Sequence, residues 1–131
     1  CDLKNSVYGI EIKGTKKRGG YVRGVKVSDC VLPRVLFHSV GYNDDGISAG
    51  TAPVFENCTF QNVQINGAYL SKNKEWCQCT AIELSGFEET DRELRGIEFR
   101  DVQLGMEGML QEQTLSLRLC QNITFRNLNC V

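Results

Sequence analysis

A run of basic residues near the N-terminus contains the side chains best suited to bind a charged ligand. Residues 11–26 carry six bases and one acid, a net charge of +5, whereas the rest of the chain carries a net charge of −6. The six bases are Lys13, Lys16, Lys17, Arg18, Arg23 and Lys26. A local basic patch on an otherwise acidic chain favours a specific anionic ligand over bulk binding of nucleic acid. The alternative is a solvated loop, where Lys and Arg are common.

The spacing of the cysteines does not indicate a metal site. There are seven of them, so at least one stays unpaired within the chain. Cys77 and Cys79 are too close for the usual zinc hook, and the chain has a single histidine, so no cofactor is expected. Cys30, Cys58, Cys120 and Cys130 occupy apolar positions of strand patterns, where a reduced thiol behaves as a small hydrophobe. This favours a reducing compartment, although the sequence leaves cytoplasmic and secreted locations open.

Four nine-residue segments with one shared pattern indicate the fold. In each segment, positions 1, 4, 6 and 9 are apolar, position 3 is Asn or Gly, and position 8 is Asn or Asp. The remaining positions can hold any residue. They are residues 22–30, 55–63, 94–102 and 120–128, and they start 33, 39 and 26 residues apart. The apolar centre alternates with a period of two, as in a strand with one buried face. The flanking Asn, Asp and Gly tolerate the left-handed backbone of a sharp bend.

A second set of short strands is expected between these copies, at residues 8–12, 35–37, 80–84 and 115–119. No helical period is sustained, so strands and bends recur without crossover helices. This predicts an all-β fold, a single-stranded right-handed parallel β-helix of about four to five coils, as one domain over residues 1–131. An antiparallel sandwich would instead show hairpin dipeptides between adjacent strands. The two candidates, Asn66-Gly67 and Asp45-Gly46, do not lie between good strands.

The chain begins at Cys1 within strand-like sequence, so we expect a fragment of a longer helix. The ends of such a stack carry unpaired strand edges, which predicts end-to-end self-association. No apolar run approaches the roughly 20 residues of a membrane span, and no signal peptide is evident. We therefore expect neither a membrane nor a nucleic-acid partner.

Residues 9–15, Gly-Ile-Glu-Ile-Lys-Gly-Thr, followed by Arg18-Gly19-Gly20 and residues 21–25, resemble a stretch of the polygalacturonase family of pectin-degrading glycoside hydrolases. In that family a strand ending in Arg-Ile-Lys leads into a loop, often with Arg-Gly-Gly, and then into the next strand. The resemblance covers essentially the whole chain, because the later strands are similar to the family's C-terminal coils. It implies part of an enzyme that hydrolyses galacturonate-containing pectic polysaccharide with inversion.

The resemblance also implies substrate-binding residues. Lys13 matches a lysine that binds a galacturonate carboxylate beside the scissile bond, a role that suits an ammonium group. Glu11 stands where the family has Arg, which points to an altered substrate. Tyr42 matches a substrate-contacting tyrosine, and His38 is expected to touch sugar from the outer side of its strand. Arg18 can offer a carboxylate two parallel hydrogen bonds. The implied partner is an anionic polysaccharide or oligogalacturonide.

The catalytic acids of the family are expected to lie outside this chain. Inverting glycosidases need one carboxylic acid and one carboxylate base. The family carries them in an Asn-Thr-Asp motif and an Asp-Asp pair upstream of the Ile-Lys strand, and neither precedes Lys13 here. The acidic segments at residues 43–46 and 88–91 are interpreted as loops. The chain is therefore predicted to form one wall of a substrate cleft, without catalytic residues.

Two alternatives remain open. One is a non-catalytic, carbohydrate-binding or structural β-helix, which differs in lacking the catalytic acids throughout the parent protein. The other is a fragment of a polysaccharide lyase on the same fold. Such lyases usually bind calcium through clustered acidic residues on strands, and the strand segments show no cluster of that kind.

Overall fold

The computed structural model describes residues 1–40, 50–89, 91–109 and 113–131, and within these ranges the chain forms strands and no helix. The strands are β1 (Ile10–Gly14), β2 (Tyr21–Arg23), β3 (Lys26–Leu32), β4 (Val35–Ser39), β5 (Val54–Ile65), β6 (Ala68–Leu70), β7 (Trp76–Gln78), β8 (Ile82–Ser85), β9 (Leu94–Leu104), β10 (Leu115–Arg118), β11 (Cys120–Gln121) and β12 (Thr124–Cys130). No described helix is long and apolar enough to cross a membrane.

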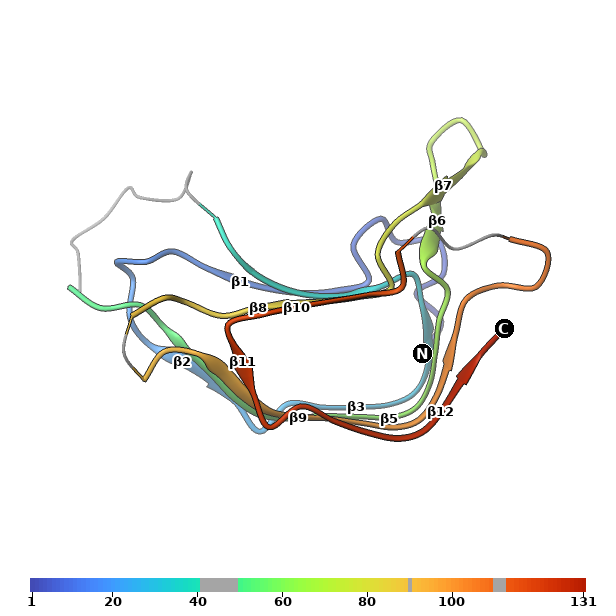
Figure 1. Ribbon diagram of the computed structural model, residues 1–131. Coiled ribbons are helices and arrows are strands. Elements are labelled where there is room, and N and C mark those ends of the chain that lie inside the picture. Colours follow the sequence, from blue (N-terminus) through green and yellow to red (C-terminus); the bar gives the residue numbers. More distant parts are fainter. Residues whose placement is uncertain (41–49, 90, 110–112) are drawn as a thin grey trace.

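Two parallel sheets face each other and form the two main layers of the molecule (Figure 1). The smaller sheet has the order β1-β4-β8-β10. In the larger sheet, β5 pairs with β2 and β3 on one side and with β9 on the other, and β9 then pairs with β11 and β12. The chain alternates between these two sheets, and each visit to both sheets is one pass of the chain. Within each of the two sheets, a strand therefore pairs with the strands of neighbouring passes. The expected all-β architecture with parallel pairing is therefore confirmed.

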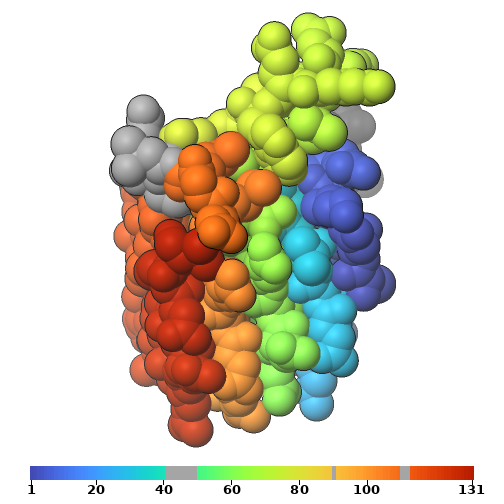
Figure 2. Space-filling model, turned by 90° about the vertical axis from the view of Figure 1, so that its right-hand side faces the viewer, coloured from blue at the N-terminus to red at the C-terminus, as the bar shows by residue number. Residues whose placement is uncertain are grey.

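Successive passes lie side by side in sequence order, from the red C-terminal pass to the blue N-terminal pass (Figure 2). The registers align equivalent positions of the repeat, as with Phe60 opposite Phe99 and Phe99 opposite Phe125. The rings of these three residues stack, with centroids 4.9 and 5.3 Å apart. Phe37 of the opposite sheet meets Phe60 edge-on at 6.3 Å. The alternating apolar residues of both sheets thus fill one shared core.

The Asn, Asp and Gly residues of the repeat adopt the left-handed backbone that the sequence predicted for bends. The first bend in each copy has φ values of 54–70° and lies at Gly24, Asn57, Gly96 and Asn122. The second has φ values of 52–56° and lies at Asp29, Asn62, Asp101 and Asn127. These are conformations that Asn, Asp and Gly tolerate better than other residues. Each copy is therefore a short strand between two bends.

One antiparallel hairpin departs from the repeat. β6 and β7 pair with Tyr69 opposite Cys77, and the hairpin projects from the stack in both views (Figures 1 and 2). The repeated pattern predicts neither strand of this hairpin, in which Trp76 opens β7. Three-residue strands give too little alternation to be recognised. The turn also lacks a hairpin dipeptide and uses Lys74 at a φ of 61°.

All seven cysteines are unpaired, and Cys30 and Cys58 are buried in the core. Burial raises the pKa of the Cys58 thiol above its ordinary value, which opposes formation of a thiolate. Both residues therefore pack as the small apolar side chains that the strand pattern predicted.

Candidate binding cleft

Lys13 and Arg18 line the same cleft, which has a volume of about 320 Å³. Lys13 belongs to β1, and Arg18 lies in the loop that joins β1 to β2. The polar side chains of the lining are those of Lys13, Thr15, Arg18 and Tyr21. The apolar side chains are those of Val22, Val40, Pro53 and Phe55. Two cations thus meet an apolar wall, which suits a ligand that combines a carboxylate with a less polar ring.

Backbone hydrogen bonds fix the loop that carries Arg18. The Arg18 amide donates to the Thr15 carbonyl at 3.3 Å, and the Gly19 amide donates to the Thr51 carbonyl at 2.9 Å. The Gly20 carbonyl accepts from the Val54 amide at 3.0 Å. Gly19 and Gly20 have φ values of 62° and 82°, a backbone that glycine adopts without steric cost. The backbone of this turn therefore favours glycine at both positions after Arg18.

Glu89 and Arg92 hold the far wall of the cleft. The Ala52 amide donates to Glu89 Oε2 at 2.7 Å, and Arg92 Nε donates to the Ala52 carbonyl at 3.0 Å. Pro53, the next residue, lines the cleft. Glu89 belongs to the acidic segment 88–91, which the sequence predicted to be a loop without a catalytic role. Its carboxylate accepts a hydrogen bond from the Ala52 backbone amide, next to the cleft wall.

Thr15 is a cleft residue for which sequence reasoning found no role. Its side chain is 5% exposed, and its Oγ1 makes no hydrogen bond in the described part of the structure. An unsatisfied buried hydroxyl costs about 1–3 kcal/mol. The Gly-Thr that follows Lys13 was part of the resemblance, but nothing in the sequence indicates that Thr15 is buried.

His38 lies next to Lys13 in the sheet register but does not line the described cleft. Its Nε2 is 2.8 Å from Glu11 Oε1, and both side chains are mostly buried. An ionised carboxylate only accepts hydrogen bonds, so Nε2 is the donor. Glu11 thus partners the single histidine. Tyr42, the remaining candidate from the sequence, lies outside the described residues.

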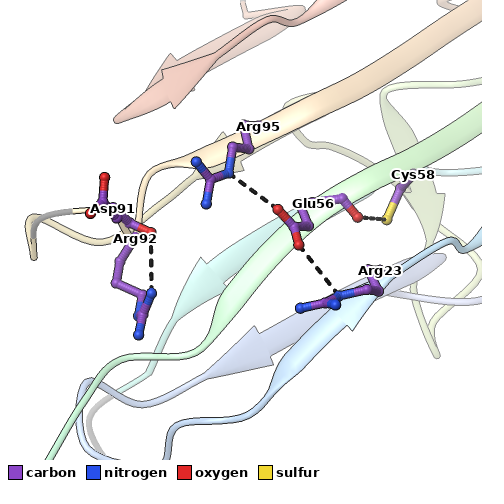
Figure 3. A network of polar contacts seen from close by, with 6 residues as sticks. All are labelled: Arg23, Glu56, Cys58, Asp91, Arg92 and Arg95. Atoms are coloured by element: carbon purple, nitrogen blue, oxygen red, sulfur yellow. Dashed lines mark hydrogen bonds and ion pairs between the residues drawn. The ribbon is translucent and has the colours of Figure 1, made fainter.

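Arg23 takes part in a network on the outer face of the larger sheet (Figure 3). Glu56 accepts from both neighbours, with Arg23 Nε 3.3 Å from Oε1 and Arg95 Nε 3.2 Å from Oε2. The Arg23 guanidinium also lies 4.0 Å from the centroid of the Tyr21 ring, which is a cation–π contact. Arg23 therefore neutralises an acid and supports Tyr21 at the cleft rim, instead of offering its charge to a ligand.

A larger hollow, of about 510 Å³, lies along the second bends of the repeat. Its lining includes the bend residues, and these already bond to each other. Asn62 Nδ2 donates to Asp29 Oδ1 at 2.7 Å, and Asn127 Nδ2 donates to Asp101 Oδ1 at 2.8 Å. We prefer the smaller cleft because two cations of the basic run line it together. In the described ranges, no group of three or more His, Cys, Asp or Glu side chains could hold a metal ion.

Comparison with known proteins gives no relative. No protein-family model matches the chain, and neither a curated protein nor a solved structure matches it. The evidence for function therefore lies in the chain's own residues and their geometry.

Proposed function

We propose that this chain is a stack of right-handed parallel β-helix coils that binds an acidic, galacturonate-containing polysaccharide in the cleft around Lys13 and Arg18. The coil architecture is supported by the alternation of the chain between two parallel sheets and by the left-handed bends at equivalent repeat positions. Right-handed winding is the rule for connections between parallel strands of one sheet.

The observation that carries the binding proposal is that Lys13 and Arg18 share one cleft. A Lys ammonium supplies a compact positive charge, and an Arg guanidinium can bind a carboxylate through two hydrogen bonds. Tyr21, which is 65% exposed at the rim, offers apolar surface for the face of a sugar ring. An uncharged sugar would use the apolar surface but not the cations, which is why we favour an acidic one.

The chain alone is expected to bind without hydrolysis. Inversion at a glycosidic carbon needs two carboxyl groups roughly 6.5–9.5 Å apart. The described lining of the cleft contains no Asp or Glu side chain. In our proposal, a parent glycoside hydrolase of the polygalacturonase type supplies both acids from other coils. The lack of an acid in the described lining also favours a second candidate, a non-catalytic carbohydrate-binding coil stack.

Calorimetric titration of the chain with oligogalacturonides tests the proposal. We expect saturable binding that weakens as salt is added, because salt screens the attraction between the carboxylates and the two cations. Lys13→Gln and Arg18→Gln should each weaken binding. Lys26→Gln is the matched control, since it removes one charge from the same basic run outside the described cleft lining. Equal losses for Lys13→Gln and Lys26→Gln would show that only overall charge matters, which would refute a cleft site.

Activity of the parent protein separates the two candidates. Release of reducing sugar from polygalacturonate by a longer protein containing this chain supports the hydrolase. Binding without turnover in that longer protein supports the non-catalytic stack.

A further inference from the structure

We propose that the larger hollow, along the second bends of the repeat, is a separate binding groove for an uncharged, hydroxyl-rich glycan chain that lies across the strands. Among the described lining residues, the hollow shares none with the cleft around Lys13 and Arg18. The groove would therefore bind its ligand independently of that cleft.

Two rows of side chains line this hollow, and both rows cross the passes that lie side by side in Figure 2. The first row consists of the second-bend residues, and the second row consists of the residues two positions further along each strand. The rows are Asp29, Asn62, Asp101 and Asn127, and then Val31, Gln64, Gln103 and Asn129. The registers place Gln103 between Gln64 and Asn129. Neighbouring strands lie about 4.8 Å apart, so each row repeats at about this spacing.

The second row offers hydrogen-bonding groups that a ligand can reach. Gln103 and Asn129 are exposed, and their side chains form no hydrogen bond within the described part of the chain. A side-chain amide carries two donor hydrogens and an acceptor oxygen. Donors and acceptors are therefore open at two adjacent passes of the groove.

The bend residues of the first row are exposed as well and keep part of their hydrogen-bonding capacity. Asn62 Nδ2 donates to Asp29 Oδ1 at 2.7 Å, and Asn127 Nδ2 donates to Asp101 Oδ1 at 2.8 Å. Each bond uses one of the two amide hydrogens, and the amide oxygen can still accept. The same bonds hold the planar groups in defined orientations, which lowers the entropy that a ligand must remove on binding.

Rows of amides and carboxylates suit sugar hydroxyls, because each hydroxyl both donates and accepts. The spacing of about 4.8 Å between passes is close to the length of one sugar unit in an extended glycan. The described lining runs from Asp29 in the first pass to Asn127 in the fourth, which corresponds to about 14 Å across three strand spacings. The groove is therefore long enough for more than one sugar unit.

The charges of the groove favour an uncharged ligand. Its described lining contains two acids, Asp29 and Asp101, and no Lys, Arg or His. Acidic polymers would be repelled by these carboxylates. The two acids are also poorly placed to share a calcium ion, because they lie two strand spacings apart, about 10 Å, with Asn62 between them. Calcium binds its oxygen ligands at about 2.3–2.6 Å.

Calorimetric titration of the chain with a panel of uncharged hexasaccharides tests this proposal. The panel contains a glucan, a xylan, a galactan and an arabinan. We expect saturable binding of at least one of them, about tenfold tighter than that of the matching disaccharide, because the longer glycan contacts more passes. An oligogalacturonide of the same length should not displace it.

Gln103→Ala and Asn129→Ala each remove one exposed amide from the groove. Each should weaken binding of the hexasaccharide roughly two- to tenfold, the effect of one lost hydrogen bond. Gln61→Ala is the matched control, since it removes an exposed amide of β5 outside the described lining of the hollow, and it should leave the affinity unchanged. Thermal unfolding verifies that each variant is folded, and either groove variant carries the test if the other does not fold.

Several results would overturn the proposal. One is the absence of saturable binding for every uncharged hexasaccharide at millimolar concentration. Equal affinities for the disaccharide and the hexasaccharide would contradict a glycan that crosses several passes. Equal losses in Gln61→Ala and Gln103→Ala would show that the hollow is not the site. Displacement of the hexasaccharide by oligogalacturonide would contradict a groove that is separate from the basic cleft and selects an uncharged ligand.

Discussion

His38 Nε2 on β4 donates a hydrogen bond to Glu11 Oε1 on β1, across a distance of 2.8 Å and a sequence separation of 27 residues. The two strands pair in parallel, with Lys13 opposite His38. The sequence predicts that His38 touches sugar from the outer side of its strand, and the family resemblance places Glu11 where the family has Arg. The contact between their side chains joins two neighbouring strands beside the cleft.

Replacing His38 by Ala tests this structural role. We expect the free energy of unfolding to fall by about 1–2 kcal/mol, because the Glu11 carboxylate, which is 22% exposed, loses its partner. Affinity for oligogalacturonide should stay within about twofold of wild type, since His38 does not line the described cleft. Urea unfolding and calorimetry measure the two quantities, with Ser39→Ala on the same strand as control. A large loss of affinity with unchanged stability would instead place His38 on the sugar.

At Gly96 two features of the bend favour glycine: a left-handed backbone and a close neighbouring side chain. Its φ is 67°, and a Cβ there would lie 2.5 Å from Asn57 Oδ1 on the neighbouring strand. Gly24 has a similar φ of 70°, but a Cβ there would meet nothing within 4 Å. We therefore expect Gly24→Ala to cost about 1–2 kcal/mol for the left-handed backbone alone. Gly96→Ala should cost somewhat more, because the Asn57 side-chain amide must turn away from the new Cβ.

Urea unfolding of the two alanine variants measures this difference. Truncating Asn57 to Ala in the Gly96→Ala background should recover part of the loss, since it removes the clashing oxygen. Equal destabilisation at the two glycines would contradict the close approach of Asn57 to Gly96.

The column of second bends alternates between Asp and Asn, and this alternation should matter for stability. Asn62 donates to Asp29 on one side, and the register places Asp101 beside it on the other. Asn62→Asp would remove the donor and put three carboxylates in a row. We expect a loss of about 1–3 kcal/mol near pH 7. The loss should shrink as salt is added, because salt screens the repulsion between exposed carboxylates.

Asn122→Asp is the control for this prediction. Asn122 has the same left-handed backbone, but the β9–β11 register brings it beside Gly96, which carries no charge. Its substitution should therefore change stability much less. Chemical denaturation at low and high salt measures both variants, and a salt-independent loss in Asn62→Asp would argue against charge repulsion.

Cysteine alkylation compares the reactivity of buried thiols with that of exposed thiols. Burial raises the pKa of the Cys58 and Cys120 thiols, so a smaller fraction of each is thiolate at a given pH. We expect iodoacetamide to modify the exposed Cys1 and Cys130 first near pH 8. The relative rates at Cys58 and Cys120 should rise as the pH is raised, because their ionisation lags. Peptide mass mapping follows each site, and early modification of Cys58 would contradict its burial.

The repeated pattern predicts the two classes of strand and the bends, because these depend on local alternation and on residues that tolerate a positive φ. Val22 to Cys30, for example, contains both bends of its copy, at Gly24 and Asp29. The strand limits differ by a few residues, since edges such as Leu104 of β9 depend on pairing with Ile65 of β5. The three-residue strands of the β6–β7 hairpin carry too little pattern to be found.

The site is less predictable from the sequence than the strands. The basic run and the resemblance predicted that Lys13 and Arg18 bind a ligand, and both residues line one cleft. The close approach of Pro53 to Gly14 could not be foreseen, because these residues lie far apart in the sequence. The contact between His38 and Glu11 likewise depends on the register of β1 and β4.

A titration of the isotopically labelled chain with oligogalacturonide, followed by amide chemical shifts, tests the central claim most directly. We expect saturable shifts at Lys13, Thr15 and Arg18 and in the wall at Phe55, with little change in the β6–β7 hairpin. Shifts concentrated around the exposed Trp76 of that hairpin, or an absence of shifts throughout the chain, would contradict an acidic-sugar site at Lys13 and Arg18.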